Sequence, residues 1–306
     1  PDGLSVSLSV TGTEDNVLTG NLSGTYTAAT YRISGDLTIA SGDTAYLHAG
    51  TQFLFDGQYN FNIYGKLKAI GTETDSIIFD NFIDEKWRGF TLDGASDSTA
   101  FEYVKISGAE NNYFGGGMYL NGSNPTLTHV NIANNTANLG GGMRLSSSNP
   151  TLTNSIIWNN SPESISLYYG DEQPLITYSD IEGGWEGGYC IGNNEFCHDA
   201  NLDECVNMIV FELCDEWIAE ITNINSDPLF TDPENGDYTL QESSPCIDAG
   251  IIIEDMEYCG SAPDMGAFEY ITEDCEECGA ELADVNGDGQ INILDLVQIA
   301  NLILET

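Results

Sequence analysis

Basic residues are scarce in this chain of 306 residues. Lys and Arg together number 7 against 49 Asp and Glu, so the formal net charge at pH 7 is −42. Such a chain repels phosphate, which makes nucleic acids and anionic membrane surfaces poor partners and cations good ones. The sequence also lacks an apolar run long enough to span a bilayer. Because the acidic side chains repel each other, we expect folding to depend on bound calcium or on high salt.

The sequence contains 8 cysteines, an even number, and almost none of them are spaced as metal ligands. Only Cys275 and Cys278 have the spacing of a metal or redox pair, and no second such pair accompanies them. This pattern favours disulfides, which form in secreted proteins. Proximity along the chain suggests the pairs Cys190–Cys197, Cys205–Cys214, Cys246–Cys259 and Cys275–Cys278, although spacing does not determine connectivity. The start at Pro1 fits a mature secreted chain after removal of a signal peptide.

Near the C-terminus, residues 284–295 have the spacing of a calcium-binding loop. Positions 1, 3, 5, 9 and 12 of this twelve-residue stretch carry side-chain oxygens, position 6 is Gly289, and position 7 offers its backbone carbonyl. An ordinary Asx-rich turn explains the composition but not five ligand positions in register. We therefore predict Ca²⁺ as the cofactor, with the ligands Asp284, Asn286, Asp288, Gln290, Asn292 and Asp295.

An apolar stripe with helical spacing follows this loop and ends at Leu304. Loop and stripe, "DVNGDGQINILDLVQIANLIL", resemble one repeat of a type I dockerin, a family whose domains carry two such repeats and dock onto cohesins. Only one repeat is present here. Ile293 and Leu294 occupy the loop positions that largely determine partner choice in that family, where Ser-Thr is frequent. The resemblance implies an interface at Ile293 and Leu294, either with the chain's own domain or with a receptor protein that need not be a cohesin.

The centre of the chain contains an internal repeat. Residues 115–135 recur at 140–160 with 14 of 21 positions identical, and a period of this size in β-rich sequence predicts a solenoid of stacked strands. Asn134-Asn135 and Asn159-Asn160 are predicted to stack at a corner as turn residues and not as ligands. The residues predicted to point inward are Met118, Leu120, Leu127, Val130, Ile132, Met143, Leu145, Leu152, Ile156 and Ile157.

These repeats resemble the right-handed parallel β-helix family of secreted bacterial proteins. The likeness extends from "DLTIASGDTAYLHAGTQFLF" through "WRGFTLDGASDSTAFEYVKISG" to "NINSDPLFTDPENGDYTLQESSPCIDAG" and "APDMGAFEY", over roughly residues 30–271. It implies an all-β solenoid, with residues 1–29 as an N-terminal strand or cap segment and 272–306 as a linker and calcium loop followed by a helix. Within the solenoid, residues 185–222 form a Cys-rich insertion with an apolar stripe that predicts one disulfide-pinned helix. This insertion is either a lid on the core or an interaction surface.

The N-terminal segment has an alternating pattern in which Leu4, Val6, Leu8 and Val10 are separated by serines. Such a pattern predicts an amphipathic strand. This strand either caps the open end of the solenoid or is donated to a neighbouring molecule. The four apolar residues are therefore a second predicted interface, and the choice between the two arrangements stays open.

Catalysis needs consideration because parallel β-helices include pectate lyases and polygalacturonases. The Asn-Thr-Asp, Gly-His-Gly and Arg-Ile-Lys signatures of polygalacturonases are absent from this sequence. A lyase needs a Lys or Arg as base beside calcium-binding acids. The candidates are Arg32, Lys66, Lys68, Lys86, Arg88, Lys105 and Arg144. We interpret Lys66, Lys68 and Arg88 as solvated or ion-paired surface charges and predict that the chain is not an enzyme.

The leading hypothesis is a secreted, calcium-stabilised structural protein at the cell surface or outside the cell. Its dissimilar ends favour a homo-oligomer or polymer, because head-to-tail contact between unlike surfaces produces an open filament. A carbohydrate-binding or polysaccharide-cleaving β-helix is the first alternative, and a groove with exposed aromatic rings beside Lys or Arg would indicate this glycan partner. A surface adhesin anchored by the dockerin-like module is the second.

Overall fold

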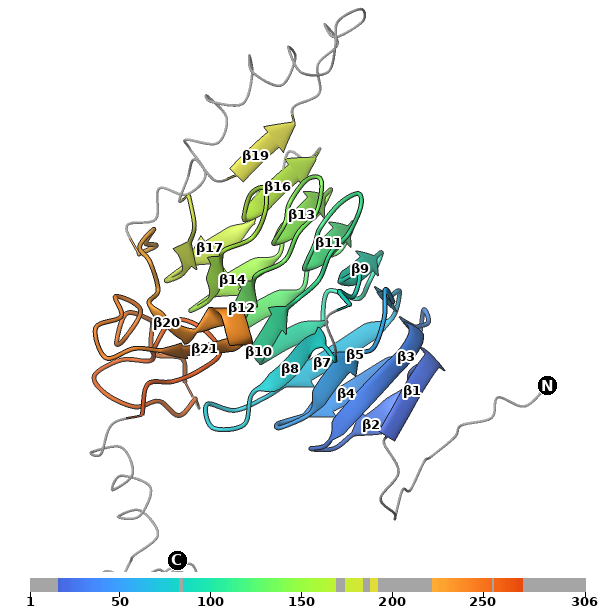
Figure 1. The fold of residues 1–306 in the computed structure, drawn as a ribbon, viewed down its shortest axis with the longest axis horizontal. Helices are drawn as coiled ribbons and strands as arrows, with labels where there is room; N and C mark the ends of the chain where they lie inside the picture. The colour runs from blue at the N-terminus through green and yellow to red at the C-terminus, as the bar shows by residue number, and fades with distance from the viewer. Residues whose placement is uncertain are drawn as a thin grey trace, which may run out of the picture.

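The computed structural model describes residues 16–82, 85–168, 174–183, 222–254 and 256–271, together with the backbone of 188–191. Nineteen strands form one sheet whose consecutive coils pair in parallel, and the sheet winds into a right-handed parallel β-helix (Figure 1). The stack runs from β1 and β2 at one end to β19 at the other. The all-β solenoid expected from the repeats is confirmed.

The β-helix has three faces, each built from one strand of successive coils. Face 1 contains β1 (Asn16–Asn21), β3 (Thr30–Ile39), β5 (Gln52–Phe55), β8 (Ile77–Asn81), β10 (Ala100–Ser107), β12 (Thr126–Ala133), β15 (Ile156–Trp158) and β18 (Asp180–Ile181). Face 2 contains β6 (Phe61–Ile63), β9 (Phe90–Asp93), β11 (Met118–Asn121), β13 (Met143–Ser146), β16 (Ile165–Tyr168) and β19 (Gly188–Ile191). Face 3 contains β2 (Gly24–Tyr26), β4 (Thr44–His48), β7 (Lys66–Ile70), β14 (Thr151–Thr153) and β17 (Leu175–Thr177).

Four long strands bend across two faces. β1 and β3 continue from face 1 onto face 2, whereas β10 and β12 begin on face 3 and end on face 1. Both β1 and β2 lie inside the segment 1–29 that the sequence assigns to a cap. The solenoid therefore already includes Asn16, upstream of the expected boundary at residue 30.

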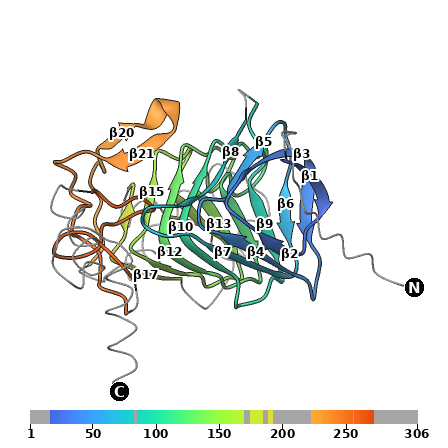
Figure 2. The same cartoon turned by 90° about the horizontal axis from the view of Figure 1, so that it is seen from below.

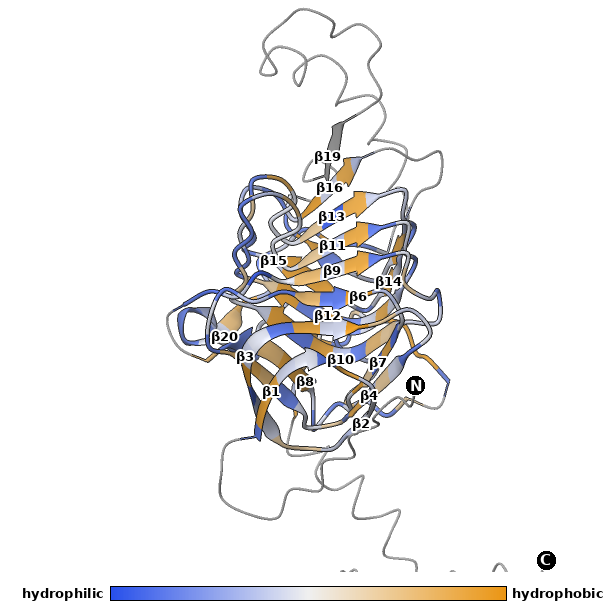
Figure 3. Cartoon of the chain, turned by 90° about the vertical axis from the view of Figure 1, so that its right-hand side faces the viewer, coloured by the Kyte–Doolittle hydropathy of each residue, from blue (hydrophilic) through white to orange (hydrophobic). Residues whose placement is uncertain are grey.

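Alternation along the strands places one apolar set inside the solenoid, and Figure 3 shows hydrophobic residues recurring on the stacked strands of face 2. Nine of the ten residues predicted to point inward belong to this core. Ile156 is the exception: it is fully buried, but in a second apolar cluster outside the solenoid. In the early coils the core is aromatic, with Phe55 stacked on Trp87 at 4.3 Å between ring centroids and Phe79 edge-on to Phe90 at 4.8 Å.

Buried asparagines join the coils at one corner. Asn135 Nδ2 donates to Asn160 Oδ1 at 3.1 Å, and Asn135 Oδ1 accepts the backbone N–H of Ala109 at 2.9 Å. Asn134 and Asn159, one residue earlier, have φ values of 55°, which asparagine tolerates better than most residues. The predicted amide stacking at this corner is thus confirmed.

The Gly-Gly-Gly repeats allow neighbouring coils to approach closely. A Cβ built on Gly116 would lie 2.3 Å from the Gly141 carbonyl oxygen, and one built on Gly141 would lie 2.3 Å from the Ser161 carbonyl oxygen. Real Cβ atoms do not come so close to backbone atoms, so both positions require glycine.

A terminal segment, defined here as residues 223–271, folds back along face 1. It contains an antiparallel hairpin of β20 (Phe230–Asp232) and β21 (Asp237–Leu240), joined by the 3₁₀ turn η2 (Pro233–Asn235), and the hairpin lies beside the stack in Figure 2. Tyr238, Leu240 and Met265 pack with Ala133 and Ile156 in the second apolar cluster. One face of the solenoid is therefore covered along several coils.

Several predicted elements lie outside the described residues. These are the strand around residues 4–10, the helix and most disulfides of the insertion, and the calcium loop with its helix. The described part of the chain contains no α-helix. Near the start of the insertion, the described backbone of β19 is a strand that pairs with β16. The insertion therefore begins by continuing face 2.

Candidate functional site

The predicted metal and interface residues all lie outside the described residues. This holds for the calcium ligands of residues 284–295, for Ile293 and Leu294, and for the apolar residues of 4–10. Within the described ranges, no group of three or more His, Cys, Asp or Glu side chains is placed to hold a metal ion. In the same ranges, no helix combines the length and apolar character needed to cross a membrane.

The predicted pair Cys246–Cys259 is wrong. Cys246 is a free, fully buried thiol whose Sγ lies 3.3 Å from Asp180 Oδ2, whereas Cys259 is disulfide-bonded and so has a different partner. Burial and the nearby Asp180 carboxyl raise the pKa of the Cys246 thiol far above its usual value. Pairing by proximity along the chain gave the wrong partner, because the terminal segment packs Cys246 against the solenoid. The other predicted pairs, Cys190–Cys197, Cys205–Cys214 and Cys275–Cys278, involve side chains outside the described residues.

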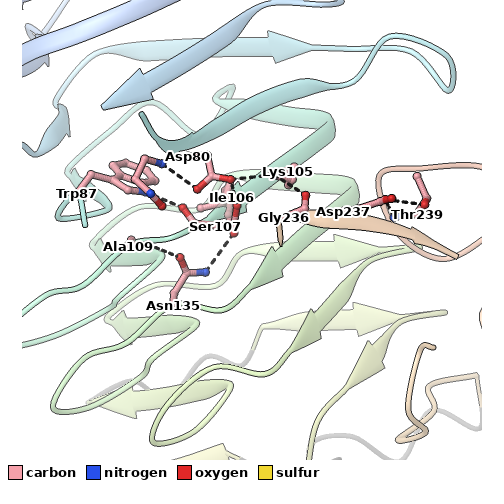
Figure 4. Close-up of polar contacts among 11 residues, drawn as sticks. Asp80, Trp87, Lys105, Ile106, Ser107, Ala109, Asn135, Gly236, Asp237 and Thr239 are labelled. Carbon is pink, nitrogen blue, oxygen red and sulfur yellow. Dashed lines mark hydrogen bonds and ion pairs between the residues drawn. The ribbon is translucent and has the colours of Figure 1, made fainter. Parts of the chain in front are cut away.

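The most elaborate polar site in the described part of the chain is the junction between face 1 and the terminal hairpin (Figure 4). The Lys105 side chain is 7% exposed; its Nζ lies 2.8 Å from Asp80 Oδ2, donates to the Gly236 carbonyl oxygen at 3.0 Å, and sits 5.1 Å from the Tyr238 ring centroid. Ser107 Oγ donates to the same Asp80 oxygen at 2.8 Å. This ammonium group is therefore paired, desolvated and aimed at structural partners, and it is poorly placed to remove a proton from a substrate.

A polar cleft opens beside this junction, with a volume of about 340 Å³. Its walls come from the end of β8, the corner after β10, and the turn between β20 and β21. Glycine is favoured at Gly108 because its φ is 69°, and a Cβ there would also push against the side-chain oxygens of Asn81 and Asp80. Lys86, half-buried, also lines the cleft. Since Asp80 is already engaged by Lys105 and Ser107, the cleft does not present it as a free carboxylate.

The remaining candidate bases also have structural contacts. Arg32 Nε lies 2.6 Å from Asp56 Oδ2, and Arg88 Nη2 donates to Gln58 Oε1 at 2.8 Å. Lys66 lies over the Tyr46 ring, Lys68 lies near the Glu102 carboxylate, and Arg144 is buried between two aromatic rings. Arg32 is ion-paired, Arg88 and Lys68 lie beside polar partners, and Arg144 is a buried residue that packs against rings. Sequence reasoning did not foresee that Lys105 would hold the terminal segment, although a lone Lys between Val104 and Ile106 was a signal.

Buried titratable groups gather beneath the terminal segment. Burial raises the pKa of the Asp180 carboxyl to about 7 although Ser226 donates a backbone hydrogen bond to it. His129 is fully buried, stacks on Tyr103 with centroids 4.5 Å apart, and has its pKa lowered by burial to about 4. The Asn154 amide nitrogen lies 3.0 Å from His129 Nε2. These groups order the interface and leave no open position for a substrate at His129.

Two more buried acids shape the terminal segment itself. Asp264 accepts the backbone N–H groups of Asp248 and Tyr270, and Glu269 accepts those of Cys259 and Asp264. Burial raises the pKa of Asp264 to about 6 and that of Glu269 to about 7. Both carboxyls thus serve as acceptors that fold the loops of the segment.

Comparison with known proteins agrees with this geometry. Residues 68–208 match a family model described as the right handed beta helix region. No curated protein and no solved structure gives a significant match. The match fits polysaccharide-cleaving enzymes and non-enzymes alike. The matched span begins within β7 and includes the described strands up to β19, so the described residues of this span form a right-handed β-helix by both sequence and structure.

Proposed function

We propose that the chain is a non-catalytic extracellular structural protein whose copies assemble end to end, and that Ca²⁺ bound by residues 284–295 stabilises the assembly. The observation that carries the proposal is that most of the end strands pair with described residues on one side only; β18 is the exception, because Asp180 bridges Ile224. Among the described residues, β1 pairs only with β3 and β2 only with β4, while at the other end β17 pairs only with β14 and β19 only with β16.

In a parallel stack the two open edges are complementary, because each strand donates and accepts differently toward the coil above and the coil below. An edge of this kind is a template for pairing with another chain. Val17 on β1, 50% exposed, leaves the first coil with an apolar outer surface as well. End-to-end contact would continue the coil spacing from one copy to the next, and unlike ends that do not close a ring produce a filament.

The absence of catalysis is supported by the positions of the basic residues. In the described ranges, Lys105 and Arg144 are buried, and Arg32 and Arg88 are bonded to Asp56 and Gln58. A base that removes a proton must be desolvated enough to lose its own proton and also reach the substrate. Lys105 is held by Asp80 and by the Gly236 carbonyl oxygen, so it does not meet the second condition.

Electron microscopy and light scattering of the full chain, in millimolar Ca²⁺ and then in excess chelator, test the proposal. We expect filaments in Ca²⁺ that shorten or disappear on chelation. The variant Asp284→Ala/Asp288→Ala should behave in Ca²⁺ as the wild type does in chelator. Asp97→Ala/Glu242→Ala, which removes the same charge at two exposed positions of the described chain, is the matched control. Monomers under all conditions would overturn assembly, and filaments insensitive to chelator would overturn the role of calcium.

A further inference from the structure

Arg144 on β13 lies between two exposed aromatic rings on face 2. Its guanidinium carbon is 5.4 Å from the Phe114 ring centroid and 5.1 Å from that of Tyr168, and the Arg144 side chain donates to Ser166 Oγ. Arg144 itself is only 3% exposed, whereas Phe114 and Tyr168 are 41% and 39% exposed. The arginine therefore packs against both rings, and part of each aromatic side chain meets solvent.

The aromatic surface extends beyond these two rings. Tyr119, one coil before Arg144 in the ladder, lies 6.0 Å from Phe114 between centroids, and Tyr113, next to Phe114 in the chain, is 70% exposed. The strands of face 2 stack evenly at this level in Figure 3, and the terminal segment packs on face 1. The aromatic surface, defined as Tyr113, Phe114, Tyr119 and Tyr168, thus extends across the coils from β11 to β16, on a face that the terminal segment does not cover.

Polar side chains lie beside the rings on this face. Asn121 Nδ2 donates to Asp93 Oδ1 at 2.8 Å on the same face, and Ser146 follows Asn121 in the ladder. Protein partners and membranes favour extended apolar patches, whereas this face has amide and hydroxyl side chains beside its rings. A sugar ring has apolar C–H faces and hydroxyl edges, so it uses aromatic rings together with amide and hydroxyl neighbours.

Charge decides the class of sugar. The Arg144 guanidinium is opposed by the nearby Glu163 carboxylate, and the whole chain carries a net charge of −42. An acidic polysaccharide would be repelled over most of the surface. We propose that the aromatic surface binds a neutral polysaccharide without cleaving it, with Phe114 and Tyr168 in contact with sugar rings and Arg144 as a positioning residue. This binding does not depend on end-to-end assembly.

Affinity electrophoresis of the full chain tests this site, with gels containing mixed-linkage β-glucan, galactomannan or hydroxyethyl cellulose, and polygalacturonate as the acidic comparison. We expect at least one neutral polymer to retard the wild type, and Phe114→Ala and Tyr168→Ala each to weaken that retardation at least tenfold. Tyr46→Ala is the matched control, because Tyr46 is 43% exposed and lies over Lys66 on face 3. Arg144→Lys should weaken binding less than either ring removal.

Thermal melts of each variant show whether its fold is intact before binding is compared. No retardation by any of the three neutral polymers would overturn the proposal, as would equal weakening in Tyr46→Ala. Stronger retardation by polygalacturonate would overturn the choice of a neutral ligand. Release of reducing ends from a bound polymer would overturn binding without cleavage, and retention of binding under chelation would separate this site from the calcium-dependent assembly.

Discussion

Lys105 and Gly236, 131 residues apart in the chain, are joined by a hydrogen bond of 3.0 Å from the ammonium group to the backbone carbonyl oxygen. The same ammonium group forms the 2.8 Å ion pair with Asp80. One side chain thus connects two coils of the solenoid with the terminal hairpin. Loss of the Lys105 side chain should therefore weaken the attachment of the hairpin more than it weakens the solenoid.

Replacing Lys105 with Met should destabilise the protein by about 3–5 kcal/mol, because Asp80 is left largely buried without its cation. Urea unfolding measures the free energy, and limited proteolysis should release peptides of the terminal segment sooner than in the wild type. Lys105→Met/Asp80→Asn should recover much of the loss. Lys66→Met, which removes a lysine that only overlies the Tyr46 ring, should change stability by no more than about 0.5 kcal/mol. Equal losses in Lys105→Met and Lys66→Met would contradict the buried attachment.

Asp180 should make the protein more stable on mild acidification. Its pKa is raised in the fold from 3.8 to about 7, so the folded state binds the proton more tightly than the unfolded state. The stabilisation is complete below pH 3.8 and is lost as the pH rises through 7. Thermal melts between pH 8 and pH 5 should therefore show a rising midpoint, and Asp180→Asn should flatten this slope. A slope unchanged in Asp180→Asn would assign it to Asp264 and Glu269, whose pKa values are raised in the same sense.

His129 should act in the opposite direction at lower pH. Burial lowers its pKa from 6.5 to about 4, so its contribution is complete above pH 6.5 and is lost as the pH falls through 4. Together with Asp180, this predicts a stability maximum in the mildly acidic range. NMR should show the His129 imidazole resonance titrating near pH 4 in the folded protein. Titration at pH 6 or above would show that the ring is not buried against Tyr103.

The buried side-chain amide of Asn135 should contribute several hydrogen bonds to the free energy of unfolding. Asn135→Ala removes partners from Ala109 N–H, the Ile106 carbonyl and Asn160, all of them buried, so we expect a loss of about 2–4 kcal/mol in urea unfolding. The control Asn121→Ala removes an exposed amide bonded to Asp93 and should change stability by no more than about 0.5 kcal/mol. A similar small loss in Asn135→Ala would mean that water replaces the missing amide.

Much of the solenoid could be predicted because its coils are repeated in sequence. The alternation of Met118 with Leu120, the stacked asparagines and the strand class all follow from local patterns, and the structure confirms them. Ile156 was misplaced because the alternation rule assumes that only one side of a strand is covered. The consecutive apolar residues Ile156, Ile157 and Trp158 were a signal that both sides of β15 are buried.

The path of the terminal segment could not be predicted, because it depends on contacts between residues far apart in the chain. The sequence around Cys246 does not indicate that Cys246 contacts Asp180. Likewise, the sequence around Gly236 does not indicate its hydrogen bond with Lys105. The aromatic surface had a weaker signal. Phe114, Arg144 and Tyr168 lie about one coil apart in sequence, but their convergence required the register of face 2.

The terminal segment changes how the solenoid should respond to stress. A plain stack of coils unfolds from its ends, since each repeat touches only its neighbours. Here one strap fastens Ser76 to Ala267 through a hydrogen bond of 2.5 Å, Lys105 to Gly236, and Asp180 to Ser226. Those coils cannot unfold one by one unless the terminal segment also loses its contacts with the other coils. The coils from β8 to β18 should therefore open as a single cooperative unit. During synthesis they become one unit only after the terminal segment has been made.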